Sequence, residues 1–592
     1  MDVLLIKHFL FILLIQVTFF ELYSCGIAIG RTPIIKTNLG KVVGEIERYS
    51  IGDVAYFFGI PYGKPPIGEL RFAKTQPAES WNDIFEATEE ASYCYEPITS
   101  ARFVRKKYSE DCLTITIAIP PKALQEPGSR PVIVDMGRDN SANTYDGYIT
   151  EYYPLVIKQD LILVRINSRR NIFGFAYTMA DNELNGNYGL WDQNMGLHWI
   201  KDNIKNFGGD PNKITIFGSG SGGQLSVAHL ASPYSRGLFE NVIIQSRSLF
   251  TLNSNVNERV DESTNIVIKR VGCTNAKNVR DCLRQKDPQE LIDAIPNRWE
   301  AFVPVLDSDY IPLMTGEISA HGQGEVATDR PNINVLLGYS QGEASLQLSQ
   351  IAPNIFSDTK LTTKDALEVI EMLFKKEAVD KVAEIYLGDA NQPLSISKIQ
   401  NGLTKLINDI TITCPLVLTG IGTSTGQKEG QTYFFVFNHL VNWHANSLCN
   451  SQYEEGICPL DNVSVEYGIA YTDEFGHKYS DEDRKITDKL QNIFGTFART
   501  GKPPMSPNEW PSYNSKPDKY PALILTSKKD TLDYSIGKYC VENAKFLDDS
   551  LIDPKYYPLD EYTIPKQKKV DYKSNLKNIL RNQLYYAAFQ NY

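Results

Sequence analysis

The sequence has little cysteine, few histidines and no excess of positive charge. Its 592 residues include only 9 Cys and 7 His, and the formal net charge is −11. So few cysteines exclude a small disulfide scaffold. The acidic balance argues against nucleic acid or an anionic membrane as the main partner. With 40 Gly and 31 Pro, the chain is neither collagen-like nor a low-complexity array. We expect no cofactor and no metal.

The N-terminus carries the one long apolar run. Residues 3–20 are apolar except for three positions, and the small residues of SCGIA follow. This pattern predicts a signal peptide over residues 1–26; the alternative is an uncleaved membrane anchor. Because no later stretch reaches the ~18 consecutive apolar residues of a membrane span, we expect a secreted mature chain without one. Cys25 would leave with the signal, and eight cysteines would remain.

The body of the chain alternates short apolar runs with helical patterns. A composition of 42% apolar and 22% charged residues fits a globular protein. Residues 194–207 have helical periodicity. Buried strands are predicted at 131–136, 161–166, 213–217, 241–246 and 334–340. Alternating elements predict an α/β fold with a large, mostly parallel central sheet and helices on both faces. Functional groups in such folds gather at the carboxyl ends of the strands.

Four long strings then point to a known family. They are FFGIPYGKPPIGELRF (57–72), SEDCL (109–113), GNYGLWDQ (186–193) and NFGGDPNKITIFG (206–218). In order and spacing the chain resembles the type-B carboxylesterase/cholinesterase family over residues 32–548, which we take as one domain. The resemblance implies an α/β-hydrolase fold. Family members hydrolyse carboxylic esters with a Ser, a Glu and a His, and several relatives are non-catalytic adhesion or scaffold proteins.

The resemblance places the three catalytic positions, and two are changed. The nucleophile elbow reads G-x-S-x-G, but here Gly220 fills the serine position between Gly218 and Gly222. The family's acid falls on Glu343. Its histidine position is Pro459, which has no proton to exchange. We therefore expect the nucleophile and the base to be lost and the acid to be retained.

The oxyanion hole is also expected to be degenerate. The family carries a His-Gly-Gly-Gly run after the strand that matches 131–136, and its amides approach the developing oxyanion. Here the run reads Gly137-Arg138-Asp139-Asn140. The residue after the nucleophile supplies another amide, at Ser221. Asp139 would add negative charge where negative charge must be stabilised.

Two other interpretations of the glycine-rich turn stay open. Gly218, Gly220 and Gly223 also spell G-x-G-x-x-G, a dinucleotide-binding pattern. Its confirming carboxylate is missing, because the next apolar run ends in Gln245-Ser246. A divergent hydrolase could instead use Ser219 or Ser221. For a base it would need a recruited histidine, and we expect structural or solvated roles for the histidines of the mature chain. These are His198, His229, His321, His439, His444 and His477.

The sequence also carries candidate disulfides, one N-glycosylation sequon and a basic C-terminal tail. The resemblance implies the pairs Cys94–Cys112, Cys273–Cys282 and Cys414–Cys540; we expect the remaining Cys449 and Cys458 to pair, although sequence alone does not prove connectivity. Asn462 heads the sequon for N-glycosylation. The tail, 549–592, contains a basic amphipathic helical pattern, which suits packing on the domain or docking a partner.

These observations predict a secreted, non-catalytic carboxylesterase-like protein that acts by protein–protein recognition or adhesion through an extracellular protein partner. The alternative is a carboxylic-ester hydrolase with displaced catalytic residues. An oligomer is compatible with either.

Overall fold

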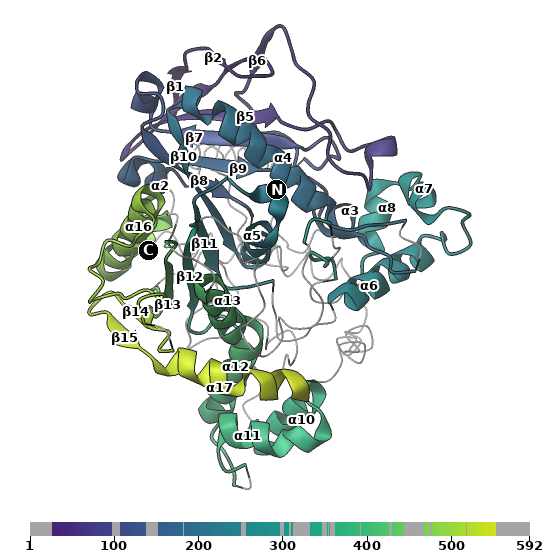
Figure 1. Cartoon of the computed structure of the whole chain (residues 1–592), viewed down its shortest axis with the longest axis vertical. Helices are drawn as coiled ribbons and strands as arrows, with labels where there is room; N and C mark the ends of the chain where they lie inside the picture. Colours follow the sequence, from purple (N-terminus) through teal and green to yellow (C-terminus); the bar gives the residue numbers. More distant parts are fainter. Residues whose placement is uncertain are drawn as a thin grey trace, which may run out of the picture.

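A twelve-stranded mixed sheet runs through the middle of the computed structural model (Figure 1). Its strand order is β1-β4-β5-β7-β9-β8-β10-β11-β12-β13-β14-β15. The pairs from β9 through β8 and β10 to β14 are parallel, whereas the pairs at both ends of the sheet are antiparallel. A separate small sheet has the order β2-β3-β6. The α/β-hydrolase architecture expected from the sequence is confirmed.

The strands have the following bounds: β1 Ile27–Arg31, β2 Ile35–Lys36, β3 Lys41–Val43, β4 Glu45–Tyr49, β5 Gly52–Pro61, β6 Ile84–Glu86, β7 Thr114–Ile119, β8 Arg130–Asp135, β9 Ile162–Ile166, β10 Gly209–Ser219, β11 Asn241–Gln245, β12 Asn334–Ser340, β13 Thr432–Phe437, β14 Ala522–Leu525 and β15 Thr531–Asp533. The five strands predicted from the sequence are thus all present, as β8, β9, β10, β11 and β12.

The helices have the following bounds: α2 Tyr153–Gln159, α3 Asn171–Phe175, α4 Tyr188–Asn203, α5 Ser221–Ala231, α6 Val256–Arg270, α7 Val279–Arg284, α8 Pro288–Asp293, α10 Thr363–Leu373, α11 Val379–Leu387, α12 Ile396–Asn408, α13 Cys414–Thr425, α16 Asp481–Thr500 and α17 Ser535–Ser550. A π-helical turn, Asp409–Thr413, joins α12 to α13. The helix expected at 194–207 begins six residues earlier, at Tyr188.

Helices cover both faces of the sheet, and the central strands are therefore buried on both sides. Alternate residues of β10, Ile216 and Phe217, belong to two different apolar clusters. The Ile216 cluster includes residues of α4, α5, α12 and α13, and the Phe217 cluster includes residues of α2 and α16. Figure 1 shows α2 and α16 on one side of the sheet and α5 and α13 on the other.

One continuous helical stretch, Ile396–Ser424, is long and apolar enough to cross a membrane by length and composition. It contains α12, the π-helical turn and most of α13, and most of it is buried inside the protein. Its apolar side chains, such as Leu403, Leu406 and Leu416, belong to the core on the α5 side of the sheet. Core packing is therefore sufficient to explain its composition.

The structure describes residues 27–96, 107–137, 152–180, 183–249, 256–296, 301–306, 309–311, 332–345, 348, 352, 355, 361–390, 392–425, 429–442, 466, 468–473, 476–516 and 518–551. Several predictions fall outside these residues: the signal peptide, the tail beyond Leu551, Arg138, Asp139, Pro459, the Cys449–Cys458 pair and Asn462. They stay predictions, as do the domain boundaries.

Candidate functional site

The glycine-rich turn lies where β10 ends and α5 begins. Gly220 has φ 58° and ψ −121°, a conformation that L side chains rarely adopt. A Cβ at Gly218 would lie 1.9 Å from the main-chain oxygen of Gly222, and one at Gly223 would lie 2.6 Å from that of Arg247. The sharp strand-to-helix elbow is therefore present, and its glycines are required by close main-chain contacts.

Main-chain hydrogen bonds hold this elbow between two neighbouring strands. The Gly220 amide donates to the Gln245 carbonyl at the end of β11, at 3.0 Å. The Ser219 amide donates to the Gly137 carbonyl, just after β8, at 3.5 Å. Gly220 thus lies at the carboxyl edge of the sheet, where α/β folds place their functional groups.

The two serines of the elbow lie on either side of Gly220. Ser219 is the last residue of β10, and it is buried. Because side chains alternate along a strand, Ser219 faces the same side as Phe217, toward the α16 layer. Ser221 is the first residue of α5, on the other side of the turn. Neither serine has the backbone position of an elbow nucleophile.

Gly137 is the residue of the expected oxyanion segment that the structure describes. Its amide donates to the carboxylate of Asp135 at 2.9 Å, so this N–H is already directed at a negative group. Asp135 is buried and pairs with Arg165 at 3.2 Å. A Cβ at Gly137 would lie 3.3 Å from Nη2 of Arg170, and Arg170 is 3.5 Å from Glu96. Charged side chains therefore surround the start of this segment.

The expected acid, Glu343, lies in the turn that follows β12. The side chain is buried, and the Ser340 amide donates to its Oε2 at 3.3 Å. The next residue, Ala344, donates its amide to Asn408 Oδ1 at 3.3 Å, and Asn408 Nδ2 donates to Thr413 Oγ1 at 2.9 Å. The π-helical turn between α12 and α13 therefore braces the loop that carries Glu343.

His229 has a structural environment. Its ring is buried in α5 between Ser235 Oγ and Tyr310 OH on Nδ1, at 2.8 and 2.9 Å, and Gln193 Oε1 on Nε2, at 3.1 Å. Burial lowers the pKa of His229 to about 3. The imidazole therefore stays neutral and serves packing, as expected from the sequence.

Of the other described histidines, His439 pairs with Asp483 at 2.7 Å, and His198 and His477 are exposed. His321 and His444 lie outside the described residues.

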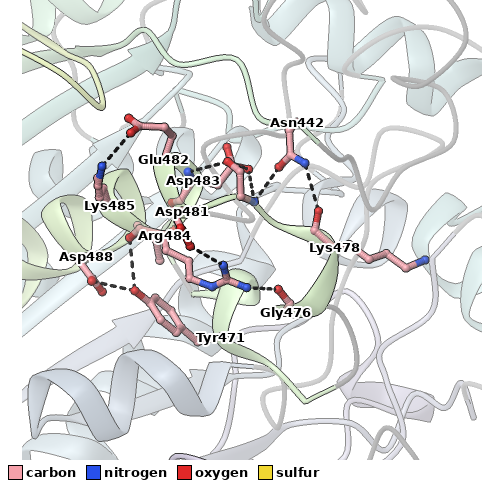
Figure 2. A network of polar contacts seen from close by, with 12 residues as sticks. Asn442, Tyr471, Gly476, Lys478, Asp481, Glu482, Asp483, Arg484, Lys485 and Asp488 are labelled. Carbon is pink, nitrogen blue, oxygen red and sulfur yellow. Dashed lines mark hydrogen bonds and ion pairs between the residues drawn. The ribbon is translucent and has the colours of Figure 1, made fainter.

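Polar contacts fix the segment around the start of α16 (Figure 2). Asp483 bonds to Ser480, completing a capping box at the helix N-terminus, and Asn442 Nδ2 donates to the Lys478 carbonyl at 3.2 Å. The Tyr471 hydroxyl donates to Asp488 Oδ2 at 2.7 Å, and Arg484 Nη2 donates to the Gly476 carbonyl at 2.6 Å. These contacts tie together the chain on both sides of residues 443–465, a range that includes Pro459, the expected base position.

Sequence reasoning missed several buried polar side chains, on β11 and β12 at the carboxyl edge of the sheet and on α16. Gln245, Ser340 and Gln491 have no exposed surface. Their polar atoms Nε2 and Oε1 of Gln245, Oγ of Ser340 and Oε1 of Gln491 have no hydrogen-bond partner. No motif marks them, because their burial depends on how β11, β12 and α16 come together.

Three disulfides are present in the part of the chain that the structure describes: Cys94–Cys112, Cys273–Cys282 and Cys414–Cys540. These three pairs agree with the expectation. Within the same residues, no group of three or more His, Cys, Asp or Glu side chains could hold a metal ion.

The chain belongs to the carboxylesterase family, whose family model matches residues 31–536. This match spans the glycine-rich turn, so we interpret the turn as a nucleophile elbow and not as a dinucleotide-binding loop.

Three relatives align with most of this chain, and the alignments cover most of each relative. The chain is 28% identical to acetylcholinesterase from Danio rerio, with 85% of this chain and 87% of the relative covered. It is 27% identical to liver carboxylesterase 1 from Mus musculus (82% and 88% covered). It is 30% identical to esterase E4 from Myzus persicae (80% and 87% covered).

Proposed function

We propose that this chain is a non-catalytic member of the carboxylesterase family that acts by binding an extracellular protein. The observation that carries the proposal is Gly220: the elbow has its strained backbone conformation, but its central residue has no hydroxyl group. Loss of a triad nucleophile costs on the order of 10⁶ in turnover, and loss of the base adds little because the triad acts as a unit.

Two further observations support the absence of ester hydrolysis. The Gly137 amide is bonded to Asp135, so binding an oxyanion would require breaking that contact beside a carboxylate. His229 and His439 are held by other partners, and His229 is neutral and buried. Both ring nitrogens of His229 and Nε2 of His439 therefore already have partners other than Ser219 or Ser221.

Secretion of the chain is part of the proposal. Three disulfides suit an oxidising compartment, and the N-terminal apolar run has the pattern of a signal peptide. N-terminal sequencing of protein recovered from the culture medium of expressing cells tests this: a start near residue 27 supports it, and a retained Met1 in the cell membrane contradicts it.

The competing function is carboxylic-ester hydrolysis through Ser219 or Ser221. The names of the relatives, an acetylcholinesterase, a carboxylesterase and an esterase, favour this candidate. Turnover of p-nitrophenyl acetate separates the two functions. We expect wild-type protein to match the spontaneous rate, and Ser219→Ala and Ser221→Ala to change nothing. Turnover above background that one of these variants abolishes would establish the hydrolase instead.

A further inference from the structure

Two glutamates lie on one face of the strand β4, near the N-terminal edge of the large sheet. Glu45 and Glu47 are separated by one residue, so their side chains lie on the same face as that of Tyr49. Glu47 is only 7% exposed, and the Tyr49 hydroxyl donates to its Oε2 at 2.5 Å. The Tyr49 hydroxyl lies 3.1 Å from that of Tyr56 on β5, and both tyrosines are buried. One carboxyl group of the pair is therefore buried against phenol groups.

No positive charge compensates this buried carboxyl group. Among the described residues, Glu47 forms no ion pair with a Lys, Arg or His side chain. The arginines of β1 and β4 pair elsewhere, Arg31 with Glu86 and Arg48 with Asp53. A buried carboxylate without a paired cation is costly, so the neutral form of Glu47 is favoured.

The elements packed against the two glutamates add mainly negative charge. The residues opposite them or acting on them are Ala28 and Arg31 on β1, Val54 and Tyr56 on β5, and Glu89 and Glu90 after β6. Burial, followed by the charges of Glu45 and Glu90, raises the pKa of Glu47 to about 7. Burial also raises the pKa of Glu45, against the attraction of Arg31. The pair therefore keeps one proton up to about neutral pH and has two negative charges above it.

The edge strand β1 depends on β4 for its place in the sheet. It is the outermost strand, and its register pairs Arg31 with Glu45 and Ala28 with Glu47 (Figure 1). All five of its residues are exposed, and Ile27 is 73% exposed. Because β1 buries little of its own surface, its stability follows from its pairing with β4.

Tyr49 joins the glutamate pair to two further segments. Its ring stacks on that of Tyr153 in α2, with centroids 3.7 Å apart. The Tyr153 hydroxyl accepts from the Asp473 amide at 2.8 Å, and the Ser50 amide donates to the Asp473 carboxylate at 3.2 Å. A second negative charge beside the Tyr49 hydroxyl would therefore act on β4, on α2 and on the segment around Asp473.

We propose that Glu45 and Glu47 form a proton-binding switch, which stabilises the β1–β4–β5 edge of the sheet when the pair shares one proton and loosens it when both carboxylates are charged. The switch goes beyond the proposed function, because it involves neither the elbow nor a partner. It makes the local stability of this edge depend on pH in the neutral range.

Hydrogen exchange measured by mass spectrometry at pH 5, 6, 7 and 8 tests the switch, with each rate corrected for the intrinsic exchange rate at that pH. Because folding raises the pKa of Glu47, its stabilisation is full below the unfolded value of about 4.3 and is lost as the pH rises through about 7. Protection factors of wild-type peptides from β1, β4 and β5 should therefore fall about tenfold between pH 6 and pH 8.

Glu47→Gln should remove most of this fall, because a glutamine can still accept the Tyr49 hydrogen bond but carries no charge. At pH 8 the variant should be better protected than wild type. Glu384→Gln, which changes an exposed glutamate on α11, is the matched control and should keep the wild-type fall. If Glu47→Gln does not fold by circular dichroism, Glu45→Gln replaces it. That variant removes the repelling charge, so the midpoint of the fall should move to lower pH.

Equal wild-type protection at pH 6 and pH 8 would overturn the proposal. The same fall in wild type and in folded Glu47→Gln would also overturn it, as would an unchanged midpoint in folded Glu45→Gln. Loss of the fall in Glu384→Gln would show that the fall does not come from this pair. None of these results depends on whether the protein hydrolyses p-nitrophenyl acetate, so the switch and the non-catalytic function can fail separately.

Discussion

Gly220 determines what the elbow can do chemically. Its φ of 58° and ψ of −121° are those of a strained turn, which glycine adopts with less cost than other residues. The hydroxyl group is therefore absent while the backbone that would present it is retained. Restoring the side chain separates the role of the nucleophile from that of the base, which the proposed function takes to be lost.

Gly220→Ser is expected to fold and to lose about 1–3 kcal/mol of unfolding free energy through backbone strain. It should gain no ester turnover, because the proposed function assigns Pro459, which supplies no base, to the histidine position. Urea unfolding and a p-nitrophenyl acetate assay measure the two effects. Gly237→Ser is the control for backbone strain, because Gly237 also has a positive φ, 75°, and a Cβ there would meet no atom within 4 Å. Turnover by Gly220→Ser well above the wild-type background would mean that a base is in place after all.

At the level of single residues, the sequence predicted those positions that a motif marks. Three cysteine pairs agree with the structure. The assignment of Gly220 and Glu343 to catalytic positions, made from family strings, stays a prediction. The burial of Gln245, Ser340 and Gln491, each with unsatisfied polar atoms, could not be predicted. Glutamine and serine are usually exposed, and only the packing of distant segments buries these.

Polar contacts fix the helix α16 at its N-terminus. Its N-terminus holds Asp483, which accepts hydrogen bonds from Ser480 in a capping box and from His439. Burial by itself disfavours the charged carboxylate, but these hydrogen bonds outweigh it and hold the pKa of Asp483 below its ordinary value. The carboxylate thus links α16 to the end of β13.

Asp483→Asn should lower the unfolding free energy by about 1 kcal/mol or more at neutral pH, because it removes the cap and the partner of His439. Since folding lowers the pKa of Asp483, its stabilisation is full above the unfolded value of about 3.9 and is lost as the pH falls through the lower folded value. The difference between wild type and variant, from urea unfolding at pH 7, 5, 4 and 3, should shrink toward pH 3.

Asp365→Asn provides the control, because Asp365 completes a similar capping box at α10 but is only partly buried and bonds to Thr362 instead of a histidine. Its effect at neutral pH should be smaller. Equal losses in the two variants would show that His439 adds nothing to the cap.

The strands and helices of the structure show which sequence patterns predicted an element correctly and which did not. The buried strands were predictable because apolar runs such as NVIIQ and NVLLGYS are covered on both faces. The first turns of α4 were missed because this helix buries polar residues. Asp192 pairs there with Arg169 at 2.8 Å, and both are buried. In a sequence, the charged residues of a buried ion pair look the same as those of an exposed turn, so the pattern did not indicate a helix there.

Across the whole molecule, disulfides tie distant segments of the chain together. Cys414–Cys540 spans 126 residues and joins α13 to α17, whereas Cys273–Cys282 spans only 9. In the chain-entropy description, longer loops restrict the unfolded state more. The long bridge should therefore contribute more to stability than the short one.

Replacing both Cys414 and Cys540 by Ala should lower the unfolding free energy by about 5 kcal/mol, against about 2.5 kcal/mol for Cys273 and Cys282. Urea unfolding of the two double variants compares them. A larger loss from the short bridge would show that local packing, and not the unfolded chain, sets the contribution.

The central claim is that this carboxylesterase-family chain has no nucleophile at its elbow. Intact-mass analysis after treatment of native protein with a fluorophosphonate measures this directly. The account predicts an unchanged mass under conditions that label an active serine esterase fully. One adduct per native chain, mapped to Ser219 or Ser221 and lost when the protein is denatured before treatment, would contradict it.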